Sequence, residues 1–156
     1  MTQKGYYEAL HAHFARVIPH AVECGLVIER LDGSGALASL PYRRDWLGDT
    51  GRGLIHTGII TTLVDTVSGL AALSSTGQFE PIATLDLRMD YLRPAVPDRT
   101  LYSHAECYRL TRSIAFVRAR AWQDDESQPV AVSQSTFMRS SRNQSKGVAR
   151  DLAGPA

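Results

Sequence analysis

Asp65 is the residue whose type and position most directly suggest chemistry. It is the only ionisable side chain between Thr57 and Ser75, a helix-length stretch in which nine aliphatic residues cover most of the circumference. It lies about two turns from the start, too deep to cap the helix or to gain much from its dipole. Because an unpaired buried carboxylate is costly, its presence here needs a reason, and one reason is a functional acid. The alternative is a structural acid that bonds to Arg or Thr neighbours or reaches an oligomer edge.

The segment that leads into this helix adds a second chemical feature. Residues 51–58 read Gly-Arg-Gly-Leu-Ile-His-Thr-Gly, so a flexible loop runs into the helix N-terminus. Free backbone N–H groups and the positive end of the dipole attract anions there. The same donors could stabilise an oxyanion on an acyl carbonyl, which with Asp65 gives two parts of a hydrolytic centre. His56 either donates a hydrogen bond to that carbonyl or only caps or packs against the helix.

The rest of the chain divides into elements that would position these groups. Apolar residues spaced three and four apart predict an amphipathic helix over 3–18, closed by Pro19. Asp32-Gly33-Ser34-Gly35 predicts a hairpin turn. The full expected order is strands at 22–31 and 36–42, a loop at 43–55, the long helix at 57–75, and strands at 82–92, 101–110, 114–122 and 130–138. Residues 140–156 are polar, with Gly and Pro, and predict a disordered tail.

This order of elements predicts an α+β fold. Strands joined by short turns pair antiparallel, and one sheet can cover its apolar face by curling around one long helix. A helix enclosed in this way should be apolar on nearly all sides. We therefore expect a single domain over 1–139, which includes the N-terminal helix, with the tail outside it.

The composition excludes several classes of protein. Lys and Arg total 17 against 16 for Asp and Glu over 156 residues, so the chain lacks the basic charge of a nucleic-acid-binding protein. Cys24 and Cys107 form neither a disulfide framework nor a metal knuckle, and His11 and His13 have no evident third ligand. The sequence shows no secretion signal and no uncharged apolar run of membrane-spanning length. We expect a cytoplasmic protein with no metal and no nucleic-acid or membrane partner.

Three segments in order resemble the PaaI-like branch of the hotdog thioesterases. They are HTGIITTLVDTVSGLAAL from His56, then ATLDLRMDYLRPA, then TRSIAFVRARAW, and the resemblance extends over residues 35–139. It implies the hotdog fold, in which an antiparallel sheet wraps one central helix, and a homodimer or a dimer of dimers. It also implies hydrolysis of acyl-CoA thioesters, without a metal or redox cofactor, at active sites on the subunit interface.

Carried over by position, the resemblance gives roles to individual residues. It implies Asp65 as the general base or the nucleophile, and the backbone N–H of Thr57 as the group that polarises the thioester carbonyl. Gly58 would permit the close approach of the substrate. Thr84 matches a Ser/Thr position that helps to place the attacking water. Thr50 is nearest to a position at which many relatives carry Asn or Gln.

Two of these positions depart from the usual pattern. The first Gly of the family's His-Gly-Gly is Thr57, which keeps a backbone donor but adds a side chain. Strict alternation along its strand places Thr84 with Asp86 and Arg88 on the polar face. Thr84 can therefore meet Asp65 only if the strand begins with a twist or bulge, or if that face lies at a subunit interface.

Coenzyme A carries phosphates, so arginines near the mouth of the site are expected to bind it. Arg93, and Arg112 with the adjoining Ser113, match family positions near the nucleotide. The acyl group is left open, because aromatic, medium-chain and long-chain thioesters are all compatible. Two other functions stand as alternatives. One is a 3-hydroxyacyl thioester dehydratase or hydratase that uses His56 and Asp65, and the other is a non-catalytic acyl-CoA-binding protein.

Overall fold

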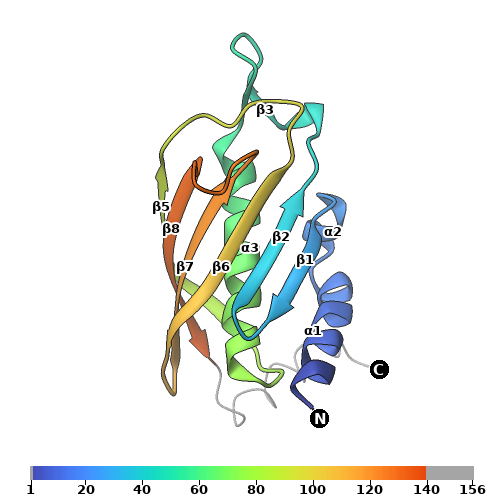
Figure 1. Cartoon of the computed structure of the whole chain (residues 1–156), viewed down its shortest axis with the longest axis vertical. Helices are drawn as coiled ribbons and strands as arrows, with labels where there is room; N and C mark the ends of the chain where they lie inside the picture. The colour runs from blue at the N-terminus through green and yellow to red at the C-terminus, as the bar shows by residue number, and fades with distance from the viewer. Residues whose placement is uncertain (1, 140–156) are drawn as a thin grey trace, which may run out of the picture.

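A six-stranded sheet, one long helix packed on it, a two-stranded hairpin and a helical N-terminus make up the described part of the molecule (Figure 1). The computed structural model describes residues 2–139, except for the side chains of 15–17, so the predicted tail at 140–156 lies outside the described residues. The elements in chain order are α1 (Gln3–Val17), α2 (Pro19–Glu23), β1 (Val27–Asp32), β2 (Gly35–Leu40), a 3₁₀ turn (Arg44–Trp46), β3 (Leu47–Asp49), β4 (Leu54–Ile55), α3 (Thr57–Thr76), β5 (Ile82–Tyr91), β6 (Leu101–Leu110), β7 (Ile114–Trp122) and β8 (Ala131–Arg139).

Six strands form a single antiparallel sheet in the order β1-β2-β6-β7-β8-β5. Short turns join β6, β7 and β8, so these neighbours in sequence are also neighbours in the sheet. β1 lies at one edge and β5 at the other. α3 lies across one face, mainly against β2, β6 and β7 (Figure 1). The predicted α+β fold, with an antiparallel sheet around one long helix, is confirmed.

Small side chains line the sheet face that meets α3. Alternate positions of the strands carry buried alanines and serines: Ala36, Ala38, Ser103, Ala105, Ala115, Ala119, Ala121, Ala131, Ser133 and Ser135. Because small side chains let the sheet approach the helix closely, the larger residues of α3 fill the space between them. Leu63, Val64 and Val67 are fully buried there. This close contact fixes the position of α3, and therefore of its polar residues, against the sheet.

α3 begins and ends at residues suited to helix termini. His56 caps the N-terminus, because its Nδ1 accepts a hydrogen bond from the N–H of Gly58 at 2.9 Å. Gly77 follows the last turn at φ 66°, a left-handed conformation that a Cβ would strain. By length and composition alone α3 could cross a membrane, but core helices of soluble proteins meet the same test, and 50% of its apolar window is buried inside the protein.

The expectation that α3 is apolar on nearly all sides is wrong. Thr57, Thr61 and Asp65 follow one another at the helical spacing of four, and Thr62 and Thr66 lie beside them. All five are exposed or half-buried. The reason is that the sheet curls around only part of the helix, since β5 touches α3 far less than β6 does. A polar stripe of α3 is therefore open in the single chain.

Two predictions for the first third of the chain are wrong. The strand expected from Val22 begins at Val27, because Pro19 occupies the first position of a second short helix, where its missing N–H removes no hydrogen bond. Gly25, at φ 74°, then turns the chain toward β1. The loop expected at 43–55 contains a 3₁₀ turn and the hairpin β3–β4, which is too short to show a periodic pattern.

α1 packs beside β1 and is fastened to the C-terminal end of α3. Tyr6 is 2% exposed, and its hydroxyl lies 2.6 Å from the carbonyl oxygen of Leu73 and 3.0 Å from that of Gln78. Burial raises the pKa of Tyr6, so the phenol keeps its proton and donates it to these carbonyls. Leu10 and Phe14 are buried on the same helix. The N-terminal helix is therefore held in a defined place over the end of α3.

Candidate active site

Asp65 and Thr84 meet where α3 passes the start of β5. The Thr84 hydroxyl donates a hydrogen bond to Oδ1 of Asp65 at 3.1 Å. The pairing of β5 with β8 shifts register between Thr84 and Asp86, so Leu85 is an extra residue on β5. A bulge therefore lies where strict alternation had placed Thr84 on the polar face. The bulge explains how its hydroxyl reaches the helix.

No cation neutralises Asp65 among the side chains that the structure describes. No Lys, Arg or His nitrogen among them lies within 4.0 Å of its carboxylate, and the hydroxyl of Thr84 is its hydrogen-bond donor. The carboxylate is half-buried rather than fully buried as the sequence predicted, because the polar stripe of α3 is open. Such a group keeps lone pairs that can accept a proton from water or attack a carbonyl carbon.

A trough of about 770 Å³ runs along α3 from these two residues. One wall is α3 itself between Thr62 and Leu73, and the opposite wall includes Ile82 and Phe137. α1 contributes Leu10, His13 and Phe14 to its lining. Most of these side chains are apolar, so the trough suits an apolar group attached to a reacting centre beside Asp65.

The N-terminus of α3 offers a free backbone donor. Nδ1 of His56 accepts from the N–H of Gly58, and the N–H of Ile59 bonds to the carbonyl oxygen of His56 at 3.0 Å. Within the described residues, the N–H of Thr57 has no acceptor. Of the two roles considered for His56, the structure shows the cap. Because Nδ1 accepts this bond, neutral His56 carries its ring proton on Nε2.

Two glycines leave the room that His56 occupies, because neither has a Cβ. A Cβ at Gly58 would lie 2.8 Å from Nδ1 of His56, and a Cβ at Gly48 would lie 2.9 Å from its Cα. Side chains cannot approach so closely, so any residue other than glycine would displace the ring or its backbone. Gly58 is thus required by the cap. Gly48, in β3, was missed in the sequence because the segment 43–55 has no periodicity.

Asp65 and the N–H of Thr57 cannot act on one carbonyl within a single chain. Eight residues of α-helix separate them, a rise of about 12 Å. A base and an oxyanion donor must each lie within roughly 3 Å of the reacting group. Between them, the hydroxyl of Thr61 lies 2.6 Å from that of Tyr91. α3 is therefore bonded to both ends of β5, at Thr84 near its start and at Tyr91 at its end.

The residues expected to bind the substrate, Thr50 near its carbonyl and the others at coenzyme A, lie apart in one chain. Thr50 is exposed in the turn between β3 and β4. The N–H of Arg93 bonds to the residue just before β8, whereas Ser113 accepts a bond from Arg139 at the end of β8. Arg112 adjoins Ser113 in the β6–β7 turn. Since the nine residues of β8 span about 30 Å, Arg93 and Arg112 lie at opposite ends of the sheet.

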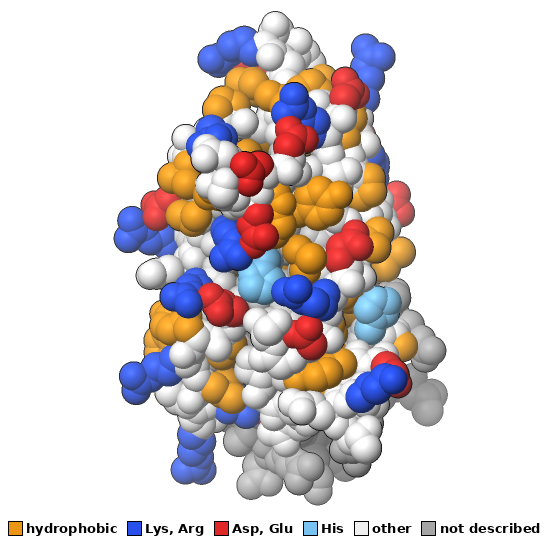
Figure 2. Space-filling model, viewed as in Figure 1, with side chains coloured by type: hydrophobic (Ala, Val, Ile, Leu, Met, Phe, Trp, Pro, Cys, Tyr) orange, Lys and Arg blue, Asp and Glu red, His pale blue; other side chains and the backbone are white. Residues whose placement is uncertain are grey.

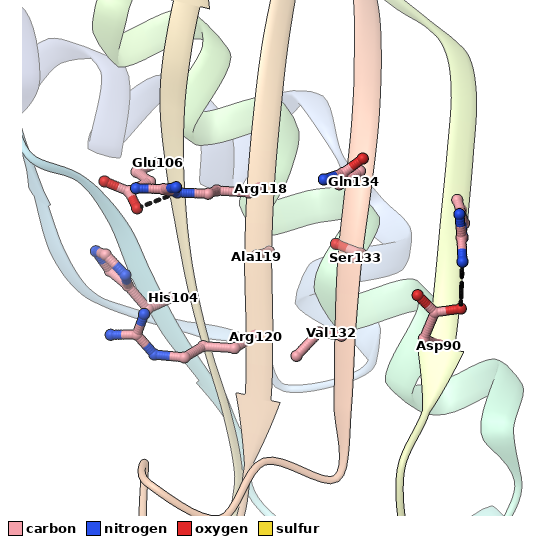
Figure 3. A pocket seen from close by; sticks show the side chains of 10 residues that line it. Asp90, His104, Glu106, Arg118, Ala119, Arg120, Val132, Ser133 and Gln134 are labelled. Carbon is pink, nitrogen blue, oxygen red and sulfur yellow. Dashed lines mark hydrogen bonds and ion pairs between the residues drawn. The ribbon is translucent and has the colours of Figure 1, made fainter.

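A second hollow, of about 400 Å³, lies on the opposite face of the sheet and contains none of the predicted site residues (Figure 3). Acidic and basic side chains are interspersed over this face (Figure 2). Around the hollow they form ion pairs: Arg88 with Asp90, Arg118 with Glu106, and Arg120 with Glu126. Throughout the described residues, no group of three or more His, Cys, Asp or Glu side chains is arranged to bind a metal.

The sequence model of the thioesterase superfamily matches residues 52–130, from the turn before α3 to the residue before β8. The chain belongs to the thioesterase superfamily. The matched region contains Thr57, Asp65 and Thr84. α1 precedes it, as do α2 and the first three strands.

Two relatives show how far the likeness to the superfamily extends. A Halobacterium salinarum protein with the provisional name of esterase is 36% identical over 121 residues, which cover 72% of this chain and 79% of the relative. The medium/long-chain acyl-CoA thioesterase YigI of Salmonella typhimurium is 24% identical over 138 residues, which cover 80% of this chain and 88% of YigI.

Solved structures share the fold. A Pseudomonas aeruginosa protein is 39% identical, with a TM-score of 0.77 and coverage of 86% of this chain and 99% of that one. The phenylacetic acid degradation protein PaaI of Thermus thermophilus, solved as a point mutant, is 27% identical, with a TM-score of 0.69 and coverage of 78% and 99%. These likenesses confirm the hotdog fold and the resemblance to PaaI-like thioesterases.

Proposed function

We propose that the protein hydrolyses acyl-CoA thioesters to a free acid and coenzyme A. The observation that carries the proposal is Asp65, a half-buried carboxylate that is bonded to Thr84, lacks a cationic partner among the described side chains, and lies beside an apolar trough. It would take a proton from the water that attacks the thioester carbonyl, or attack that carbonyl itself. Membership of the superfamily and the thioesterase activity named for YigI support this function.

The active site would lie between two copies of the chain, because Asp65 needs an oxyanion donor that its own chain does not bring to it. β5 is an edge strand of ten residues on which Leu85 is 55% and Tyr91 44% exposed, and such an edge favours pairing with another strand. In an antiparallel β5–β5 pair, the end of one strand meets the start of the other. Thr57, on the helix that Tyr91 contacts, would then approach Asp65 of the second copy.

The same homodimer would bring the coenzyme-binding candidates together. Arg93 of one copy would reach the end of the sheet where Arg112 and Ser113 of the other copy lie, and guanidinium groups there suit the phosphates of coenzyme A. A dimer of dimers would contain two such homodimers. We place the reaction in the cytoplasm, since Cys24 and Cys107 are free thiols.

Thiol release from a panel of acyl-CoAs tests the function. Hydrolysis releases the coenzyme A thiol and produces no enoyl absorbance. A dehydratase or hydratase would instead convert 3-hydroxyacyl-CoA to enoyl-CoA. The enoyl absorbance would then rise without release of thiol. Binding of acyl-CoA without either signal would replace the proposal by a binding protein.

A further inference from the structure

We propose that Arg139 and Glu80, which form a buried ion pair, position the β6–β7 turn to bind the phosphates of coenzyme A. The turn consists of residues 111–113, between the end of β6 and the start of β7. The inference rests on the proposed hydrolysis of acyl-CoA and on the coenzyme-binding role proposed there for Arg112 and Ser113. Arg139 lies outside the superfamily match at 52–130, and no pattern in the sequence indicates a role for it.

This ion pair is the most shielded one among the described residues. Nε of Arg139 lies 2.5 Å from Oε1 of Glu80, and the two side chains are 13% and 9% exposed. In every other ion pair within the described part of the chain, both side chains are at least 36% exposed. A buried ion pair is often no more stable than apolar side chains of the same size, so stability alone does not account for this one.

Arg139 holds the turn on both sides of Arg112. Its Nη1 donates to the carbonyl of Thr111 at 2.6 Å, and its backbone N–H donates to the carbonyl of Ser113 at 2.8 Å. Glu80 binds the guanidinium through Nε and, at 3.4 Å, through Nη2. The planar guanidinium has donors for all these bonds at once, so the carboxylate fixes the plane from which Nη1 reaches the turn.

The bond to Thr111 sets the direction of a donor in the turn. The carbonyl of Thr111 and the N–H of Arg112 belong to one planar trans peptide unit, in which they point in opposite directions. Because the carbonyl points to Arg139, the N–H of Arg112 points away, and within the described residues it has no acceptor. The hydroxyl of Thr111 also accepts the N–H of Ile114 at 2.9 Å and closes the turn. A fixed N–H next to the guanidinium of Arg112 suits a phosphate oxygen.

The same ion pair joins the turn to the side of the site that would receive the acyl group. Glu80 lines the trough along α3. In the sheet, Arg139 is opposite Ile82, two residues before the Thr84 that bonds to Asp65. The turn and the reacting carboxylate therefore lie at the same end of one chain. A displaced turn would change where the coenzyme lies relative to that carboxylate.

Two substrates with the same acyl group test the inference: an acyl-CoA that the wild-type protein hydrolyses, and the corresponding acyl-pantetheine, which lacks the nucleotide and its phosphates. Arg139→Lys keeps a positive charge beside Glu80 but replaces the planar fork by a single ammonium group, which cannot hold Thr111 in the same way. We expect kcat/KM for acyl-CoA to fall about tenfold, mainly through KM, as for one lost hydrogen bond to a charged group. For acyl-pantetheine, kcat/KM should change less than about twofold.

Arg118→Lys on the outer face of the sheet is the matched control, because Arg118 also pairs with a glutamate, Glu106. It should change kcat/KM for both substrates less than about twofold. Arg112→Ala should reproduce the loss that is specific to acyl-CoA. Combined with Arg139→Lys, it should lose less than the product of the two single effects, since both substitutions act on one contact.

If Arg139→Lys does not fold, Glu80→Gln combined with Arg139→Met removes both charges at similar size and should give the same loss specific to acyl-CoA. Equal losses on the two substrates would show a structural role only and would overturn the inference. An unchanged kcat/KM for acyl-CoA would overturn it as well. The proposed function fails separately, if the wild-type protein releases thiol from no acyl-CoA.

Discussion

Two hollows of this molecule, the trough along α3 and the hollow on the outer face of the sheet, hold carboxylates in opposite settings. In the hollow on the outer face of the sheet, Nε of Arg118 lies 2.6 Å from Glu106, and Arg88 lies 3.3 Å from Asp90 (Figure 3). In the trough along α3, Asp65 has the hydroxyl of Thr84 and no cation among the described side chains. Both places contain polar residues, but only one contains a carboxylate whose charge is not already satisfied.

The difference shows which charges can act on a substrate. A carboxylate paired with an arginine has its charge neutralised and its oxygens occupied by hydrogen bonds. It therefore contributes to the solubility of the surface but little to reactivity. A carboxylate that accepts one hydroxyl bond beside an apolar trough keeps its affinity for a proton. The following predictions test this contrast between the trough and the outer hollow.

Replacing the acid in each hollow by its amide should give the largest difference in turnover between the two hollows. Asp65→Asn should lower turnover by roughly 10²- to 10⁴-fold, because the amide can neither accept a proton nor act as a nucleophile. Asp90→Asn, the matched change in the outer hollow, should alter turnover less than about threefold, since it removes only an exposed ion pair. Thiol release under saturating acyl-CoA measures both. Similar losses in the two variants would end the distinction.

Removing one backbone donor should have the next largest effect. Thr57→Pro deletes the N–H at the first helical position, where proline fits well, and His56 already has the φ of −63° and ψ of 129° that a residue before proline prefers. Turnover should fall about 10²- to 10³-fold, as for a lost oxyanion donor, while the melting temperature changes little. Thr57→Ala keeps the donor and should behave nearly as wild type.

Mixing the two variants tests whether a second copy of the chain completes the active site. Asp65→Asn and Thr57→Pro chains, refolded together in equal amounts, should recover about a quarter of wild-type activity, because half of random twofold dimers are mixed and each has one intact site. Recovery no greater than the sum of the separate variants would place both groups in one chain and contradict the shared site.

Thr84 should matter less than the acid it contacts. Thr84→Val removes the hydroxyl that bonds to Asp65, and a hydrogen bond to a charged group contributes about 1.5 kcal/mol or more, roughly tenfold in rate. Thr84→Ser keeps the hydroxyl and should restore most of the turnover. If valine and serine give equal rates, the hydroxyl has no part in placing the carboxylate or its water.

The smallest expected effect comes from a substitution of His104 in the outer hollow, which should change the pH dependence of stability and not the turnover. Burial, with the nearby charges of Arg120 and Arg30, lowers the pKa of His104 in the folded protein. As the pH falls through the unfolded value of about 6.5, the unfolded chain binds a proton first, so stability is lost toward low pH. His104→Gln should therefore lose less melting temperature than wild type between about pH 7 and pH 5. An equal loss would refute this role.

Most strands could be predicted from the sequence because their signals are local. The strands at 101–110 and 114–122 have the predicted bounds, since alternation and turn residues mark both ends of each. The long helix differs from its prediction by one residue, at Thr76. Short pieces without a full period, such as α2 and the hairpin β3–β4, could not be predicted in this way.

The site was predicted residue by residue but not in its arrangement. Asp65 and the helix entry at Thr57 stand out by type and spacing, and Thr84 by the resemblance to PaaI-like thioesterases. The contact between Asp65 and Thr84 depends on the extra residue Leu85, which no alternation rule reveals. The docking of Tyr6 on the end of α3 joins residues 67 positions apart. Long-range contacts of this kind leave no periodic trace in the chain.

By itself, the sequence determined that an apolar helix carries one acid behind a glycine-rich entry, and that antiparallel strands follow it. Periodicity and residue chemistry suffice for that, since both act over a few neighbouring residues. Only the tertiary structure decided that the sheet leaves a stripe of the helix open, that Asp65 has no cation among the described side chains, and that α1 lines the trough. These features depend on how far the sheet curls and where the helix docks, which are properties of packing across the whole molecule.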